Sequence, residues 1–385
     1  MSIYNKANKK NPPYKLLALD GGGIRGMITL QVLAEIEATL RSSLGKENEK
    51  FVLADYFDYV AGTSTGAIIA TCISWGMSVK EIQKFYRESG EKMFDKAFIL
   101  NITREMRYKY GDKNLAAELK KVFGEDTTFG SERLKTLLML VMRNATTDSP
   151  WPVSNNPYAK FNNLQQPGSN LNLPLWQLVR ASTAAPTFFP PEQVQLGDKK
   201  FIFVDGGVTP YNNPAFQLFL MATLEPYNLK WQTGEDKMLL VSIGTGTTPN
   251  INLELKASQM NTLYSAQTIP GALMLASQHE QDFLCRVFGK CLLGDEVNGE
   301  VGDLIGSKGP LESKLFTYLR YDVELTRKGL DKLGGLEDID VKDVQQMDSV
   351  QHMDELERIG KAIAKKVKPQ HFDNFVDSGA LTTAI

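Results

Sequence analysis

The chain has 385 residues, 42% of them hydrophobic and 23% charged, which is the composition of an ordinary soluble globular protein. Its formal net charge is −2 and no basic stripe carries interleaved aromatic residues, which argues against a nucleic-acid polymer as a partner. The three cysteines, Cys72, Cys285 and Cys291, have neither the pattern of a disulfide framework nor zinc-ligand spacing. We therefore expect reduced thiols and no metal site.

The N-terminal stretch over residues 1–15, MSIYNKANKKNPPYK, is polar and basic and lacks the apolar segment of a signal peptide. No apolar run in the sequence approaches the length of a membrane span. We expect a cytoplasmic protein that contacts membranes only peripherally. We also expect residues 1–13 to form a flexible N-terminal segment.

The first part of the chain repeats the order strand, tight turn, helix. Residues 14–20 (YKLLALD) predict a buried strand, and after a glycine-rich turn residues 27–44 show helical spacing. Residues 51–64 end in a second strand, and the apolar run 65–75 predicts a buried helix that stops near Gly76. Strands that alternate with helices predict an α/β fold with a mostly parallel central sheet between helices.

The rest of the chain continues this pattern less regularly. We expect helices at 79–125 and 173–191, a change from helix to strand within 131–146, a loop over 148–170, strands at 199–207 and 237–246, an amphipathic stretch at 256–293, a strand at 315–326 and a final helix at 350–367. We divide the chain into a core over 14–250 and a C-terminal helical extension over 251–385 that packs on the same domain. Sites in open α/β sheets form at the carboxyl ends of strands, so we expect Asp20, Ser64 and Asp205 at one edge of the sheet.

Ser64 lies between Gly62 and Gly66 in the pattern G-x-S-x-G, which is the arrangement of a nucleophile elbow. The pattern falls between a predicted strand and a predicted helix, where such an elbow must lie, and the glycines allow the sharp turn. The simpler alternative is a glycine-rich turn in which Ser64 only caps the following helix.

The turn GGGIRG, residues 21–26, matches the pattern G-x-G-x-x-G of dinucleotide-binding loops. Such a site also needs an acidic residue at the end of the next strand, but the corresponding stretch, SLGKENEK, is a polar connection. A phosphate-binding loop of the NTPase type does not fit, because no Lys-Ser or Lys-Thr follows the last glycine. The loop can instead offer backbone N–H groups to an oxyanion. Arg25 opposes the dipole of the following helix, so we expect an anionic neighbour, either Asp20 or a lipid phosphate.

A serine nucleophile usually passes its proton to a histidine, but His279, His352 and His371 belong to no motif. Asp205 stands at a predicted strand end and is followed by two glycines. A carboxylate within hydrogen-bond reach of Ser64 can accept the proton directly if a dry pocket raises its basicity. The alternative is an ordinary Asp-Gly turn at a strand end.

In this order, the stretches DGGGIRG, GTSTG, RASTAAPTFFPP, DGGVTPYNNP and SIGTG resemble the motifs of the patatin-like phospholipase family across roughly residues 14–250. The resemblance implies a three-layer α/β/α fold and a lipid acyl hydrolase that uses a Ser-Asp dyad, without metal or cofactor. It implies Ser64 as the nucleophile, Asp205 as the base, and the amides of Gly22, Gly23 and Arg25 as the oxyanion hole. The remaining motif glycines are Gly21, Gly26, Gly62, Gly66, Gly206 and Gly207.

The implied reaction is a two-step acyl transfer through an acyl-serine, with a phospholipid or galactolipid as substrate. Side chains that could line an acyl pocket or an interfacial surface are Met93, Phe94, Phe98, Phe188 and Phe189, for which core packing is the alternative. Some bacterial relatives are anti-phage effectors switched on by cyclic oligonucleotides, which gives the hypothesis of a cyclic nucleotide activator. A homo-oligomer is a separate hypothesis. The rival functions are a non-enzymatic storage or binding protein on the same fold and a dinucleotide-binding oxidoreductase.

Overall fold

The computed structural model describes residues 3–47, 49–94, 115–186, 189–249, 254–256 and 260–376. Its strands are β1 (Tyr14–Leu19), β2 (Tyr59–Thr63), β3 (Leu137–Asn144), β4 (Ser149–Ser154), β5 (Glu192–Leu196), β6 (Lys199–Asp205), β7 (Met238–Ile243), β8 (Lys290–Leu293) and β9 (Thr317–Tyr321). Its α-helices are α1 (Ile3–Ala7), α2 (Gly26–Ser43), α3 (Leu53–Tyr56), α4 (Thr65–Trp75), α5 (Val79–Phe94), α8 (Leu175–Ser182), α9 (Ala215–Thr223), α10 (Thr262–Phe288), α11 (Arg327–Leu333), α12 (Val341–Gln345) and α13 (Met353–Ala364). A further helix covers 115–123. The short 3-10 turns used below are η1 (Gly23–Arg25) and η3 (Gly206–Val208).

A single mixed sheet of nine described strands forms the centre of the molecule, in the order β5-β6-β3-β2-β1-β7-β9-β8, with β4 paired to β3. The strands β3, β2, β1, β7, β9 and β8 run parallel to their neighbours. The pairings β3–β4, β3–β6 and β5–β6 are antiparallel. The prediction of a mostly parallel α/β sheet is confirmed, and the antiparallel part lies on the β3 side.

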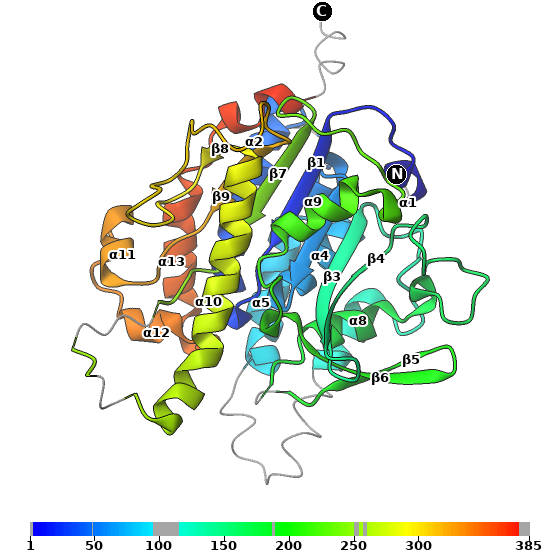
Figure 1. Cartoon of the computed structure of the whole chain (residues 1–385), viewed down its shortest axis with the longest axis horizontal. Coiled ribbons are helices and arrows are strands. Elements are labelled where there is room, and N and C mark those ends of the chain that lie inside the picture. The colour runs from blue at the N-terminus through cyan, green and yellow to red at the C-terminus, as the bar shows by residue number, and fades with distance from the viewer. Residues whose placement is uncertain are drawn as a thin grey trace, which may run out of the picture.

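Helices cover both faces of this sheet (Figure 1). α9 and α10 lie on one face, and α2, α4, α5 and α13 lie on the other. Every residue of β1, β2, β7 and β9 is buried as a result. Burial on both faces explains why these strands are continuous apolar runs rather than alternating patterns.

The N-terminal segment differs from its prediction, because residues 3–7 form α1 and pack against the sheet. Ile3 is fully buried, and Lys6 Nζ lies 3.0 Å from Asp58 Oδ1. Lys9 Nζ lies 2.7 Å from Asp58 Oδ2. These two lysines neutralise a buried carboxylate at the start of β2, which ties down a segment whose composition alone predicted flexibility.

The C-terminal region is also more than the predicted helical extension. β9 pairs in parallel with β7, and β8 pairs with β9, so residues beyond 250 extend the central sheet.

The predicted loop over 148–170 also contains a strand, β4, which is an edge strand paired with β3. Two prolines, Pro150 and Pro152, made β4 look like a loop in the sequence. Proline cannot donate a hydrogen bond to a neighbouring strand, so it is tolerated at a sheet edge such as this one.

Candidate active site

One edge of β3 brings the ends of β2 and β6 together. β4 occupies the other edge, opposite residues 139–144. β2 pairs with β3 up to Thr63, which lies opposite Val141. β6 takes over at the next position, where Asp205 lies opposite Met142. Because Ser64 directly follows Thr63, the register of three strands places it beside Asp205.

The two side chains share a short hydrogen bond. Ser64 Oγ donates to Asp205 Oδ2 at 2.6 Å. The other carboxylate oxygen, Oδ1, accepts from the amide of Gly207 at 2.6 Å, and the Asp205 amide donates to Ala184 O at 2.9 Å. Asp205 is only 4% exposed. A hydroxyl that donates to a buried, oriented carboxylate is the geometry that a nucleophile and its general base require.

The three histidines, all of them among the described residues, form no hydrogen bond with Ser64. His371 Nδ1 lies 2.7 Å from the hydroxyl of Tyr321, and His352 Nδ1 lies 3.3 Å from a carboxylate oxygen of Glu355. His279 lines a separate cavity described below.

Ser64 has a strained backbone, with φ 54° and ψ −121° at the N-cap of α4. A non-glycine residue adopts such a conformation only when its surroundings hold it there. Ser182 on α8 is one such support: its Oγ accepts from the Ser64 amide at 3.0 Å and donates to Val141 O at 2.5 Å. Ser182 lies within the RASTAAPTFFPP stretch, but no motif indicates which atoms it contacts.

The elbow glycines allow the chain to pass very close to itself. A Cβ on Gly62 would lie 2.1 Å from Gly66 O, and one on Gly66 would lie 2.3 Å from Leu19 O. A Cβ would likewise come to 3.0 Å or closer to another atom at the other predicted motif glycines, Gly21, Gly26, Gly206 and Gly207. The turn around Ser64 therefore requires glycine for steric reasons alone.

The glycine-rich loop 21–26 packs beside the elbow, since a Cβ on Gly21 would lie 3.3 Å from Ser64 Cβ. Some of the backbone amides in this loop donate hydrogen bonds within the protein, and others do not. The amide of Gly21 donates to Asn212 O at 3.1 Å, and that of Ile24 donates to Met347 O at 2.9 Å. The amides of Gly22 and Gly23 donate to no acceptor in the part of the chain that the structure describes.

Arg25 was predicted to contribute a third amide, but η1 turns this N–H back onto Gly22 O at 3.3 Å. The geometry therefore favours Gly22 and Gly23 over Arg25 as donors. The Arg25 side chain is buried, its Nε also donates to Gly22 O, and burial lowers its pKa to about 10. The expected partner Asp20 bonds to a different arginine.

That arginine, Arg320 on β9, holds Asp20 at the start of the glycine loop. Arg320 Nη1 and Nη2 donate to the two carboxylate oxygens of Asp20 at 3.0 and 2.6 Å, and Nη2 also donates to Asp322 Oδ2 at 2.6 Å. Although burial lowers the pKa of Arg320, the charges of Asp20 and Asp322 hold it well above its usual range. Thr245 Oγ1 fixes the same loop by donating to Gly21 O at 2.8 Å. Arg320 was not among the predicted site residues, because a single charge inside a buried strand forms no recognisable motif.

The predicted apolar side chains are only partly described. Met93 and Phe94 are buried in the core, and the Phe94 ring lies near that of Tyr86, whose hydroxyl is 2.6 Å from Thr65 Oγ1. Phe189 is buried beside the Arg180 guanidinium. Phe98 and Phe188 lie outside the described residues.

The part of the chain that the structure describes shows no disulfide, no helix able to span a membrane and no cluster of metal-ligating side chains. Cys72, Cys285 and Cys291 are buried and form no disulfide. No helix within the described ranges combines enough length with enough apolar character to cross a bilayer. The same ranges contain no group of three or more histidine, cysteine or acidic side chains placed to hold a metal ion.

The pKa of Asp205 predicts how the rate depends on pH. Burial raises this pKa to about 6, although hydrogen bonds from Ser64 and Gly207 oppose the shift. A carboxylate accepts the serine proton only when ionised, so we expect kcat/KM for a short-chain ester to rise with pH through about 6 and then level off. Chromatographic measurement of the released acid on both sides of pH 6 tests this, and a flat profile would contradict it.

Stability gives a second measurement of the same carboxyl. Its pKa is raised from 3.8 in the unfolded chain to about 6, so the cost of burying the charge is absent below pH 3.8 and complete above pH 6. Relative to wild type, Asp205→Asn should therefore gain stability as pH rises through this window, by on the order of 3 kcal/mol. Urea unfolding at each end of the window measures the difference.

Comparison with known proteins identifies the family of the chain. The family model described as "Patatin-like phospholipase" matches residues 17–219. The "Intracellular phospholipase A2" of Caenorhabditis elegans is 29% identical over 269 residues, which are 68% of this chain and 22% of that protein. The "cGAMP-activated phospholipase" of Vibrio cholerae is 31% identical over 212 residues, 52% of this chain and 56% of that protein. "Patatin-T5" of Solanum tuberosum is 30% identical over 261 residues, 63% of each chain.

This chain thus spans between 22% and 63% of the length of these three relatives. The matched region 17–219 includes the glycine-rich loop, the serine elbow and Asp205, and it is more than half of the chain. The chain belongs to the patatin-like phospholipase family.

Proposed function

We propose that this protein is a lipid acyl hydrolase that cleaves fatty-acyl esters with a dyad of Ser64 and Asp205. The observation that carries the proposal is the 2.6 Å hydrogen bond from Ser64 Oγ to Asp205 Oδ2. The family of the chain and the phospholipase names of its relatives support the same class of reaction.

The proposed reaction has two steps. Asp205 Oδ2 accepts the proton of Ser64 as Oγ attacks the ester carbonyl, and the resulting tetrahedral oxyanion accepts hydrogen bonds from the amides of Gly22 and Gly23. The carbon–oxygen bond to the leaving alcohol breaks, Asp205 returns the proton to that alcohol, and an acyl-serine remains. A water molecule then gives a proton to Asp205 and attacks the acyl-serine. As the bond from the acyl carbon to Oγ breaks, Asp205 passes the proton to Ser64 Oγ, which releases the fatty acid and restores both side chains.

The proposed substrate class is a phospholipid or galactolipid reached by peripheral membrane contact. Exposed apolar side chains lie beside the dyad: Val208 of η3 is 41% exposed, and Ile269 and Leu273 of α10 are 51% and 63% exposed. α10 passes close to η3, since a Cβ on Gly207 would lie 3.4 Å from Met274 Cε. This surface could enter the membrane interface while an acyl chain moves toward Ser64.

Labelling by a fluorophosphonate probe, together with fatty-acid release from phospholipid vesicles, tests the proposal. We expect wild type to be labelled and to release fatty acid, and we expect Ser64→Ala to do neither. Ser307→Ala, the same substitution at an exposed serine, should behave as wild type. Labelling that persists in Ser64→Ala would contradict the proposed nucleophile. A wild type that binds lipid without being labelled would instead support the storage or binding function.

A second proposal is that a cyclic oligonucleotide activates the hydrolase, as in an anti-phage effector. The Vibrio cholerae relative is described as a cGAMP-activated phospholipase, which favours this proposal. A rise in fatty-acid release on addition of cGAMP is the expected result, and unchanged release would contradict this activator.

A further inference from the structure

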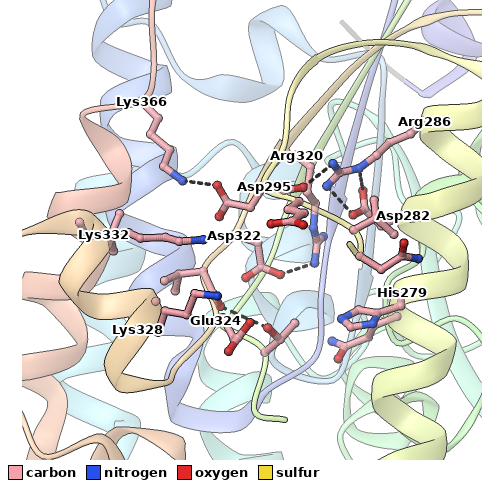
Figure 2. Close-up of a pocket in the computed structure, with 18 of the residues that line it drawn as sticks. His279, Asp282, Arg286, Asp295, Arg320, Asp322, Glu324, Lys328, Lys332 and Lys366 are labelled. Atoms are coloured by element: carbon pink, nitrogen blue, oxygen red, sulfur yellow. Dashed lines mark hydrogen bonds and ion pairs between the residues drawn. The ribbon is translucent and has the colours of Figure 1, made fainter. Parts of the chain in front are cut away.

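A polar cavity of about 560 Å³ lies next to the buried ion pair of Asp20 and Arg320. The residues after β9, the C-terminal half of α10, the segment 295–299, α11 and Lys366 form its walls (Figure 2). Its volume falls within the range of about 300–1,000 Å³ that is typical of small-molecule sites. Ser64 and Asp205 are not among its lining residues, so it is a different site from the dyad.

Most of the charged side chains in this cavity neutralise one another. Asp282 pairs with Arg286 at 2.6 Å, Asp322 pairs with Arg320 at 2.6 Å, and Asp295 pairs with Lys366 at 2.9 Å. Four charged side chains of the cavity form no ion pair within the described chain: Lys328 and Lys332 of α11, and Glu296 and Glu324.

The two unpaired lysines lie on one face of α11, four residues apart. Figure 2 shows both side chains extending from the α11 wall toward Asp322 and Glu324, with Lys366 on the same wall. Two ammonium groups that point into one cavity favour an anion, and the phosphate group is an anion that lysine commonly binds.

The remaining lining groups indicate a ligand larger than phosphate itself. Glu296, Glu324 and Asn298 line the same cavity and can accept or donate hydrogen bonds. Carboxylates would repel a bare phosphate, but they match the N–H and O–H donors of a base or sugar attached to one. The size of the cavity and this mixture of groups together favour a nucleotide.

The cavity also reaches the catalytic loop through one side chain. Arg320 lines the cavity and contacts Asp322, while its guanidinium holds both carboxylate oxygens of Asp20. Asp20 immediately precedes Gly21-Gly22-Gly23. An anion near Asp322 would compete with Asp20 for the positive charge of Arg320. It would therefore change the hydrogen bonds by which Arg320 holds Asp20 and the glycine loop.

We propose that this cavity binds a phosphate-bearing ligand of nucleotide size through Lys328 and Lys332, and that the ligand acts on the glycine loop through Arg320 and Asp20. Binding does not depend on the Ser64–Asp205 dyad, whereas the choice of cGAMP as the ligand rests on the second proposal and the effect on the loop rests on the proposed hydrolase. It places the activator of the second proposal at a defined site.

Binding is tested by calorimetric titration of Ser64→Ala protein with cGAMP, which needs no catalysis. We expect the double variant Lys328→Glu/Lys332→Glu, in the same background, to bind at least about tenfold more weakly. The control Lys342→Glu/Lys365→Glu makes the same charge change at two exposed lysines outside the cavity and should bind as the parent does. Parallel titrations with inorganic phosphate and with glycerol 3-phosphate, the phosphate portion of a lipid headgroup, should show weaker binding than cGAMP.

Any of three results would overturn the proposed site: no cGAMP binding, unchanged binding in the Lys328/Lys332 variant, or equal affinity for inorganic phosphate or glycerol 3-phosphate.

The coupling is tested on protein with Ser64 intact, by the rate of fluorophosphonate labelling with and without cGAMP. We expect cGAMP to change this rate in wild type and not in the Lys328/Lys332 variant. Binding without any change of rate in a labelled wild type would overturn the coupling, whereas a wild type that is never labelled would overturn the dyad instead.

Discussion

Replacing Asp205 by asparagine is expected to lower kcat for ester hydrolysis by about 10³-fold, the loss typical of removing a general base. The side chain keeps its size, and its Oδ1 can still accept from the Gly207 amide at 2.6 Å. The loop after β6 should therefore keep its shape. What is lost is the carboxylate oxygen that lies 2.6 Å from Ser64 Oγ, because an amide cannot take the proton.

Initial rates of fatty-acid release, measured beside circular dichroism of the folded variant, check this expectation. Asp198→Asn is the matched control, because Asp198 is exposed in the turn between β5 and β6. It should keep wild-type activity. If Asp205→Asn remained within tenfold of wild type, the proton would have to leave Ser64 by another route.

Replacing Arg320 by methionine should destabilise the protein by about 3–5 kcal/mol, the usual cost of removing one partner of a buried ion pair. Asp20 is fully buried, and both of its oxygens accept from Arg320. Burial already raises the pKa of Asp20 to about 7, so without the arginine the protein must either bury an uncompensated carboxylate or take up a proton there. Urea unfolding at neutral pH measures the loss.

Two further variants separate charge from packing in this prediction. Asp20→Asn combined with Arg320→Met removes the uncompensated charge, so the double variant should be more stable than Arg320→Met alone. Arg358→Met breaks an exposed pair with Asp338 and should have a far smaller effect. A double variant less stable than the single one would show that the Arg320 side chain matters through packing rather than charge.

The same substitution should affect catalysis, because Asp20 anchors the loop that carries Gly22 and Gly23. We expect slower fluorophosphonate labelling of Ser64 in Arg320→Met at temperatures where the variant is folded. A labelling rate equal to that of wild type would limit Arg320 to a purely structural role.

Local features of the fold could be predicted because they are encoded over a few neighbouring residues. The apolar run before the first glycines forms β1, and the run after Ser64 forms α4. Gly76 ends α4 with a φ of 85°, which is the left-handed conformation expected of a helix-ending glycine. The motifs also identified Ser64 and Asp205 as candidates, since each lies beside the glycines that its turn requires.

The predictions failed where packing against distant segments overrides local composition. The polar, basic segment before β1 looked flexible, but Lys6 and Lys9 neutralise buried Asp58. β4 looked like a loop because of its two prolines, and β3 makes it a strand by offering a free edge.

The residues that could do the chemistry were identified from short stretches, because turn glycines and apolar periodicity act over short distances along the chain. Which of these residues meet depends on how the whole chain folds. Ser64 and Asp205 are 141 residues apart, and they touch because β2 and β6 both end at the same point along one edge of β3. Asp20 and Arg320 are 300 residues apart, and parallel β1, β7 and β9 bring them to the same end of the sheet. The register of distant strands depends on the free energy of the whole packed sheet, and no short stretch of sequence contains it.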